Sequence, residues 1–210
     1  MRPVARRLEE SLARFAPHCD CNRVALTGGV AVEYHLAAAA RPALRTRIAD
    51  LDVVARAVEE ISPAVTRDFL VSHYHRPGPG VARAMLQLVD PRARLRVDVF
   101  PDAENAIAFA RFASFGRIDM LVLSPAVIFA HKLRTIGKAS STEPVDPKHV
   151  RDARALAALL GRPPAASTPY CAPARYCTDL NARCERCERS RTSDFPLAPK
   201  REIFVLLGYV

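Results

Sequence analysis

The sequence predicts an α/β (α+β) protein with a small cysteine-rich segment at its C-terminal end. Residues 4–16 carry apolar side chains at helical spacing, and short runs rich in Val, Ile and Leu then alternate with further helical stretches. Residues 163–169 are rich in Pro, Ala and Ser, a composition typical of a linker. We therefore expect a main domain over residues 1–162 and a linker plus cysteine-rich tail over residues 163–210.

Turn residues and helix-start signals divide the main domain into short elements. A strand over residues 23–27 runs through Gly28-Gly29 into a helix over residues 30–40, and a second strand covers residues 48–55. The further expected elements are a helical region interrupted near Pro63 (57–69), an extended run (69–75), a hairpin (84–89 and 95–100), a short helix (103–111), a strand (118–123) and two helices (125–136 and 147–160).

The composition is that of a globular protein with phosphate-rich partners. Hydrophobic residues make up 50% and charged residues 25% of the chain, which excludes a disordered, collagenous or coiled-coil protein. The formal net charge of +9 favours nucleic acid or nucleotides as partners, although the abundance of Arg and Ala also fits a GC-rich coding bias. Apolar runs are far shorter than the roughly 20 residues of a membrane span, and the first residues lack a signal-peptide pattern. We expect a cytoplasmic protein without a membrane partner.

Two acidic residues on one strand and a third on a later strand point to a metal site. Asp50 and Asp52 are two positions apart, so their side chains share one face of the strand. Carboxylates on one face repel each other unless a cation lies between them, and Mg²⁺ or Mn²⁺ prefers such oxygen ligands. Asp98 lies between two valines of a second β-type run and would supply a third ligand if the two strands were neighbours. Alternatively, all three are solvent-facing residues of edge strands.

Gly28 and Gly29 stand where a phosphate is commonly bound. They separate a strand from a helix, and glycine lets the backbone approach a phosphate closely. The first N–H groups of the helix and its positive dipole end favour an anion at this point. On its own the pair also fits a plain turn, but its position before an Asp-x-Asp strand favours the phosphate site.

Taken in order, five segments resemble the nucleotidyltransferase superfamily, which has the DNA polymerase β-like fold, and in particular its AbiEii-type toxin-like branch. That branch has a Gly-Gly or Gly-Ser turn, an Asp-x-Asp strand, a later acidic strand residue, a lysine helix and a Lys-Asp-x-x-Asp segment. The matching segments are Leu26–Ala31, Ile48–Val53, Val97–Phe100, Leu123–Leu133 and Lys148–Asp152. In the last segment His149 stands where the branch has Asp.

The resemblance covers residues 20–160 and implies a mixed β-sheet flanked by helices. It implies an enzyme, a metal-dependent nucleotidyltransferase that moves a nucleoside monophosphate from a nucleoside triphosphate to an acceptor. The acceptor is a small molecule, RNA or protein, and a cognate regulatory protein is a further partner if the chain is part of a toxin–antitoxin pair. The alternative is a non-catalytic module of the same fold that binds nucleotide or nucleic acid. The expected site residues are Asp50, Asp52 and Asp98 for catalysis and Mg²⁺ (or Mn²⁺) binding, and Gly28, Gly29 and Lys132 for nucleotide binding.

Several other polar residues leave two interpretations open. Lys132 either reaches a triphosphate oxygen as a point charge or covers a core edge with its aliphatic part. Lys148 and Asp152 are four positions apart on a helix and either act at the site or pair with each other. His73 and His75 share one face of an extended run, which is either a partly exposed strand face or a contact to a metal or nucleotide.

The tail carries four cysteines in the order C-x5-C-x6-C-x2-C: Cys171, Cys177, Cys184 and Cys187. The last pair has the short spacing of zinc knuckles, and the segment is too short to build an apolar core of its own. We therefore expect these four residues to bind a structural Zn²⁺, with disulfides or unpaired thiols as the alternatives. The arginines around them make nucleic-acid phosphates an expected contact of the tail.

Overall fold

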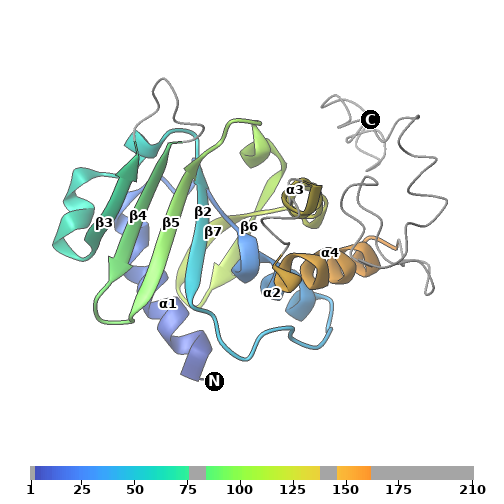
Figure 1. The fold of residues 1–210 in the computed structure, drawn as a ribbon. Coiled ribbons are helices and arrows are strands. Elements are labelled where there is room, and N and C mark those ends of the chain that lie inside the picture. Colours follow the sequence, from blue (N-terminus) through green and yellow to red (C-terminus); the bar gives the residue numbers. More distant parts are fainter. Residues whose placement is uncertain (1–2, 76–83, 138–145, 162–210) are drawn as a thin grey trace. The chain divides into compact units, whose positions relative to one another are not determined.

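The computed structural model describes residues 3–75, 84–137 and 146–161 (Figure 1). Contacts divide the chain into two compact units, Met1–Ser124 and Pro125–Val210, and each is described by itself. Among the described residues, no helix combines the length and the apolar character that crossing a bilayer requires.

The first unit is built on a mixed sheet of seven described strands. They are β1 (Val24–Thr27), β2 (Asp50–Ala55), β3 (Leu70–His75), β4 (Met85–Asp90), β5 (Leu95–Pro101), β6 (Ala110–Phe115) and β7 (Ile118–Leu123). Their order in the sheet is β3-β4-β5-β2-β1-β7-β6 (Figure 1). The pairs β1–β7 and β2–β5 are parallel, and the other neighbours are antiparallel.

The helices of the first unit place the apolar core on one face of the sheet. They are α1 (Pro3–Phe15), α2 (Gly28–Ala38) and the short 3₁₀ helices η1 (Ala16–His18), η2 (Val58–Glu60), η3 (Pro63–Arg67) and η4 (Ala106–Phe109). In Figure 1, α1 lies behind the sheet, and its residues Leu12 and Phe15 are fully buried. Leu86 and Leu88 of β4 are buried as well, whereas the alternate residues of that strand are only half-buried. The other face of β4 is therefore free to carry polar side chains.

A buried ion pair joins α1 to the turn between β4 and β5. Arg14 Nη2 lies 2.6 Å from Asp90 Oδ2, and Asp90 Oδ1 accepts hydrogen bonds from the backbone N–H groups of Arg92 and Ala93. Burial acts to raise the pKa of Asp90, but the hydrogen bonds outweigh it and hold the pKa below its usual value. The carboxylate therefore stays charged and holds both the turn and the helix.

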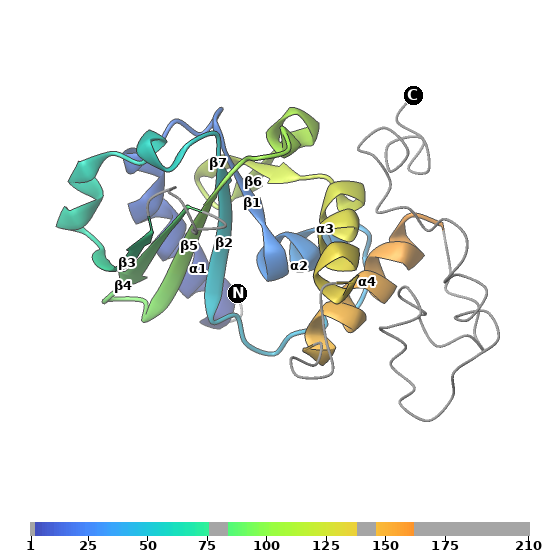
Figure 2. The same ribbon diagram turned by 45° about the horizontal axis from the view of Figure 1, so that its top comes forward.

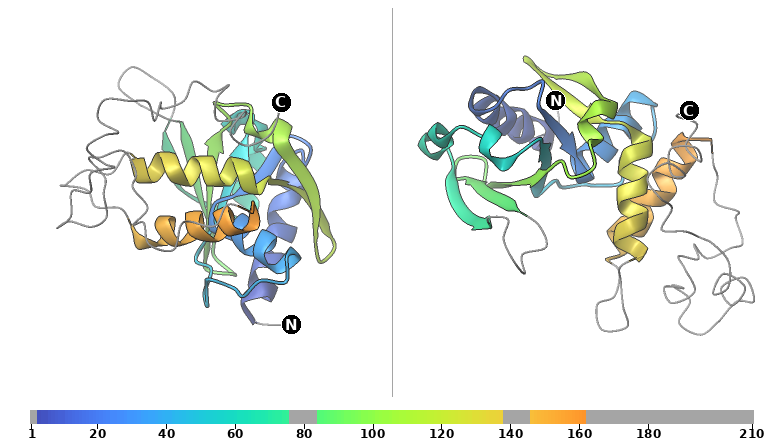
Figure 3. Two further views of the ribbon diagram at one scale, coloured as in Figure 1. Left: turned by 90° about the vertical axis from the view of Figure 1, so that its right-hand side faces the viewer. Right: turned by 90° about the horizontal axis from the view of Figure 1, so that it is seen from above.

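The second unit contains two described helices, α3 (Pro125–Gly137) and α4 (Pro147–Leu159), which pack side by side (Figure 3). Each begins with a proline, whose missing N–H would have no partner in the first turn of a helix. Asp146 caps α4, since its side chain accepts a hydrogen bond from the backbone N–H of Lys148.

Most elements lie close to where the sequence predicts them, but two expected helical regions contain only short 3₁₀ helices. Residues 57–69 form two of them on either side of a break before Pro63, and the second is capped by the side chain of Ser62. Residues 103–111 form only η4 and the start of β6, a strand that we did not expect. Gly116, with a φ of +64°, makes the tight turn from β6 to β7.

The boundary expected between residues 162 and 163 stays a prediction, because the linker and the tail lie outside the described residues. The same holds for the four cysteines expected to bind Zn²⁺. They are Cys171, Cys177, Cys184 and Cys187.

We predict that Asp90→Ala lowers the free energy of unfolding by about 3 kcal/mol, because Arg14 and the turn amides lose a buried acceptor. Urea unfolding followed by circular dichroism measures this change. The matched control is Asp119→Ala, which removes an exposed carboxylate bonded to Ser114 and should shift stability by less than about 0.5 kcal/mol. Equal losses in the two variants would contradict the role of the ion pair.

Candidate active site

The structure brings Asp50, Asp52 and Asp98 together on one face of the sheet. Asp50 and Asp52 are alternate residues of β2, and Asp98 lies on the parallel neighbour β5, directly opposite Asp52. Directly paired residues of adjacent strands point to the same face. Asp98 is buried, whereas the two β2 carboxylates are half-buried.

The same register continues as a straight row across five strands, which we call the carboxylate row. On one side, Thr27 of β1 pairs with Asp52. On the other side, Asp98 pairs with Gln87 of β4, and Gln87 pairs with His73 of the edge strand β3. Neighbouring strands are about 4.8 Å apart, so the row extends from the end of β1 across the carboxylates to the edge of the sheet.

Arg96 forms ion pairs with two of the three carboxylates. It lies on β5 two positions before Asp98 and directly opposite Asp50, so it shares their face. Its Nη2 is 3.0 Å from Asp50 Oδ2, and its Nε is 3.0 Å from Asp98 Oδ2. The side chain of Arg96 is 46% exposed, compared with 8% for Asp98. The guanidinium therefore covers the carboxylates from the solvent side.

Gln87 binds the remaining oxygen of Asp98. Its Nε2 donates to Asp98 Oδ1 at 2.9 Å, and its Oε1 accepts a hydrogen bond from Ser72 Oγ at 3.1 Å. Both oxygens of Asp98 thus have a partner, and the orientation of this carboxylate is held from β4 and β5 together. A link of side-chain hydrogen bonds joins the edge strand to the carboxylates.

Within the described residues, no group of three or more His, Cys, Asp or Glu side chains is arranged to hold a metal ion. In this arrangement, the guanidinium of Arg96 stands where a cation would bridge Asp50 and Asp98. The donor set fits a hard cation nevertheless, because three carboxylates occupy adjacent register positions and require positive charge. A metal ion and Arg96 would compete for the same oxygens.

Gly28 allows the chain to turn directly against Asp52. β1 ends at Thr27 and continues without a loop into α2 (Figure 2). Gly28 has a φ of +62°, and a Cβ at this position would lie 1.8 Å from Asp52 Oδ2. Only glycine therefore fits between the strand and this carboxylate. The consequence is that the first turn of α2 lies beside the carboxylate row.

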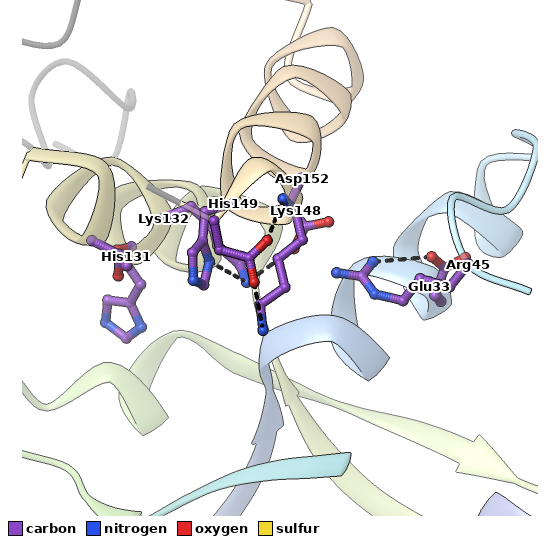
Figure 4. A network of polar contacts seen from close by, with 9 residues as sticks. Glu33, Arg45, His131, Lys132, Lys148, His149 and Asp152 are labelled. Carbon is purple, nitrogen blue, oxygen red and sulfur yellow. Dashed lines mark hydrogen bonds and ion pairs between the residues drawn. The ribbon is translucent and has the colours of Figure 1, made fainter. Parts of the chain in front are cut away.

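The guanidinium of Arg45 lies at the same glycine turn. A Cβ on Gly29 would be 3.1 Å from Nε of Arg45, so this guanidinium stands close to the backbone at the start of α2. Glu33 holds it with an Nη1–Oε1 distance of 3.1 Å and also accepts a hydrogen bond from the backbone N–H of Leu44 (Figure 4). The turn combines a helix N-terminus with an arginine, and both favour an anion.

Lys132, which we expected at the nucleotide, lies on α3 in the second unit. Its Nζ is 2.9 Å from Asp152 Oδ2 and 3.4 Å from His149 Nδ1, both on α4 (Figure 4). Asp152 is fully buried, and Lys148 pairs with Asp146 at 3.2 Å. Burial, together with the charges of Lys132 and Lys148, lowers the pKa of His149, so its imidazole is neutral near pH 7. The role of Lys132 at a nucleotide stays a prediction.

Three residues of this site were not expected from the sequence. Alternation places Gln87 on this face only after β4 has been paired with β5. Arg45 lies between the expected elements, and its position at Gly29 depends on its contact with α2. Alternation along β5 alone would have placed Arg96 on the face of Asp98.

The sequence matches no protein-family model and no curated protein sequence. Solved structures are similar to it. The antibiotic-resistance factor ANT(2'')-Ia has a TM-score of 0.50 and 15% sequence identity, over 75% of this chain and 84% of that chain. The Megavirus polyadenylate synthase has a TM-score of 0.48 and 12% identity, over 75% of this chain and 32% of that chain. A nucleotidyltransferase-like protein from Paracoccidioides brasiliensis has a TM-score of 0.42 and 17% identity, over 74% of each chain.

The similarity to ANT(2'')-Ia shows that the chain has the nucleotidyltransferase fold. The predicted fold class, a mixed sheet flanked by helices, is thereby confirmed. The matches do not identify the AbiEii-type branch, which stays a prediction. Because the sequence identity is so low, the similarity shows the fold and does not show the reaction, the metal or the acceptor.

We predict that Gly28→Ala lowers the free energy of unfolding by about 2 kcal/mol, because strain at positive φ adds to displacement of the Asp52 carboxylate. Gly116→Ala is the matched control, since its φ is +64° but the nearest atom to its Cβ, on Glu9, lies at 3.4 Å. It should cost only the backbone strain, about 1 kcal/mol. Thermal unfolding of both variants gives the comparison, and a Gly28→Ala loss no larger than that of the control would refute the close approach.

Proposed function

We propose that this chain is a metal-dependent nucleotidyltransferase that moves a nucleoside monophosphate from a nucleoside triphosphate to a hydroxyl acceptor. The observation that carries this proposal is the convergence of Asp50, Asp52 and Asp98 on one face, next to a glycine turn that opens a helix. The nucleotidyltransferase fold is consistent with it. Three carboxylates beside a phosphate-binding turn are suited to cation-assisted phosphoryl chemistry.

Asp50, Asp52 and Asp98 would hold Mg²⁺ or Mn²⁺, which neutralises charge on the triphosphate and the departing pyrophosphate when bound. Gly28, Gly29 and the nearby guanidinium of Arg45 would hold the triphosphate through backbone N–H groups and a positive charge. Lys132 is proposed as a further contact to a phosphate oxygen.

Asp98 is the residue that would act on the acceptor. It is buried and oriented by Gln87, and it stands on the side of Asp52 that faces away from the glycine turn. In the proposed step, the acceptor oxygen forms a bond to the α-phosphorus and the bond from that phosphorus to the β-phosphate oxygen breaks. Pyrophosphate leaves with the bonding electrons, and the hydroxyl proton passes to Asp98 or through it to water.

We predict that Asp50→Ala combined with Asp52→Ala abolishes label transfer, with a loss of roughly a hundredfold or more, because both carboxylates bind the metal. The assay incubates the protein with α-³²P-labelled nucleoside triphosphates, Mg²⁺, total RNA and total protein, followed by gel separation. Asp119→Asn, an exposed acidic residue of β7 outside the carboxylate row, is the control and should keep full transfer. Absence of transfer by the unaltered protein, or undiminished transfer by the double variant, would reject an enzyme.

The second candidate is a non-catalytic nucleotide- or nucleic-acid-binding module of the same fold. The observation that favours it is the guanidinium of Arg96, which bridges Asp50 and Asp98 at 3.0 Å each. If this guanidinium remained in place, the carboxylates would never receive a metal. The two candidates therefore differ in whether a divalent cation displaces Arg96.

We predict that Mn²⁺ binds the unaltered protein and that Arg96→Gln lowers its dissociation constant about tenfold, because the ion no longer competes with a guanidinium. Electron paramagnetic resonance of free Mn²⁺ measures the binding directly. Arg92→Gln, an exposed residue of the β4–β5 turn, makes the same change in charge and should leave the dissociation constant unaltered. Binding only by the Arg96→Gln variant would support the non-catalytic module.

A Zn²⁺ site, a toxin–antitoxin role and a cytoplasmic location are also proposed. The four tail cysteines would hold a structural Zn²⁺, with disulfides as the alternative. A toxin–antitoxin role with a cognate regulatory protein, and a location in the cytoplasm, follow from the sequence resemblance and composition alone.

A further inference from the structure

Resting on the proposed function, we infer that the end of the carboxylate row on β4 and β3 binds the acceptor, and that the acceptor is the 3′ end of a single-stranded nucleic acid. Its terminal hydroxyl lies at Asp98, and the bases that precede it stack on the imidazoles of His73 and His75.

The geometry of the reaction indicates which end of the carboxylate row receives the acceptor. In a phosphoryl transfer, the attacking and leaving oxygens lie on opposite sides of the phosphorus, roughly in line. Gly28 and Arg45 mark the triphosphate side, because they lie at the β1 end of the row beside Asp52. The attacking hydroxyl therefore comes from the other side, where Asp98, Gln87 and His73 follow one another on successive strands.

The β3 end of the row presents two exposed imidazoles. His73 pairs in register with Gln87 and His75 with Met85, so both side chains point to the face of Asp98. Their ring centroids are 4.3 Å apart, and both residues are exposed. Ser72, at the register shift in β3, adds a hydroxyl bonded to Gln87. Flat rings, an amide and a hydroxyl are the groups with which proteins bind unpaired nucleotides.

The charge on this part of the face argues against a cationic acceptor. No acidic residue of β3 or β4 shares the face of Gln87, because Asp90 of β4 is buried on the opposite face against Arg14. The guanidinium of Arg96, once released from Asp50, adds positive charge beside Asp98. Apart from the three carboxylates themselves, an ammonium-rich acceptor would find no counter-ion on this face of β3 or β4, whereas a phosphate would find the guanidinium of Arg96.

The length of the row favours a chain molecule. Asp98 and His73 are separated by two strand spacings, which amount to about 10 Å. An acceptor that meets both must extend over that distance from the reacting hydroxyl. A small alcohol at Asp98 would leave the imidazoles without contact, and a polynucleotide would reach them with its next bases.

The test measures the binding of 12-residue RNA and DNA oligonucleotides that carry 2-aminopurine as the second base from the 3′ end. Stacking on an imidazole quenches this fluorophore, and the expected quenching is lost in His73→Ala/His75→Ala. The dissociation constant should rise about tenfold, in keeping with the loss of base stacking. The variant His73→Phe/His75→Phe should restore both signals, because a phenyl ring stacks as well. Comparison of the RNA and DNA oligonucleotides shows which sugar is preferred.

Two exposed aromatic residues provide the controls. Phe112→Ala removes a ring from β6, the opposite edge of the sheet, and Tyr74→Ala removes one from the other face of β3. Neither should change the quenching. An oligonucleotide with 2-aminopurine at its 5′ end should report no difference between the unaltered protein and the double histidine variant.

Mg²⁺-dependent binding of a labelled nucleoside triphosphate, measured in parallel, separates this inference from the proposed function. It should be the same in His73→Ala/His75→Ala and in the unaltered protein. Normal triphosphate binding with unchanged oligonucleotide quenching in the double variant would overturn the acceptor site and leave the enzyme standing. Transfer of label to a protein or a polyamine-like acceptor in place of an oligonucleotide would overturn it as well. Absence of triphosphate binding by the unaltered protein would instead remove the proposed function.

Discussion

Repulsion among three carboxylates on one sheet face is the constraint on which the site depends. Asp50, Asp52 and Asp98 occupy neighbouring positions of two parallel strands, and such like charges are unfavourable unless a cation balances them. Arg96 supplies one positive charge from the same face and pairs with Asp50 and Asp98. The arginine therefore marks where positive charge lies against these acids.

The topology of the sheet explains why segments so far apart in the chain meet here. β2 lies between β1 and β5, antiparallel to the first and parallel to the second. The end of β1 therefore reaches Asp52, and the glycine turn that follows can lie against this carboxylate only because Gly28 has no Cβ. On the other side, β5 brings Asp98 opposite Asp52. The glycine turn and the carboxylates are thus placed by strand order, independently of any loop.

The sequence predicted those parts of the site that local periodicity defines, and missed those that depend on strand pairing. The shared face of Asp50 and Asp52 follows from alternation within one strand, and the fold class followed from the succession of short motifs. The partnership of Arg96 with Asp50 joins residues 46 positions apart, and no local pattern contains it. β6 was missed for a related reason, because Ala110–Phe115 has few β-branched residues and becomes a strand through pairing with β7.

The edge strand β3 provides the last link between fold and function. All six of its residues are exposed, so burial in the core does not determine which side chains it carries. The backbone hydrogen bonds between β3 and β4 likewise do not depend on which side chains β3 carries. Two histidines on the face of the carboxylate row, in register with Gln87 and Met85, are therefore unexplained by folding alone. A ligand that extends along the row from Asp98 accounts for both their position and their exposure.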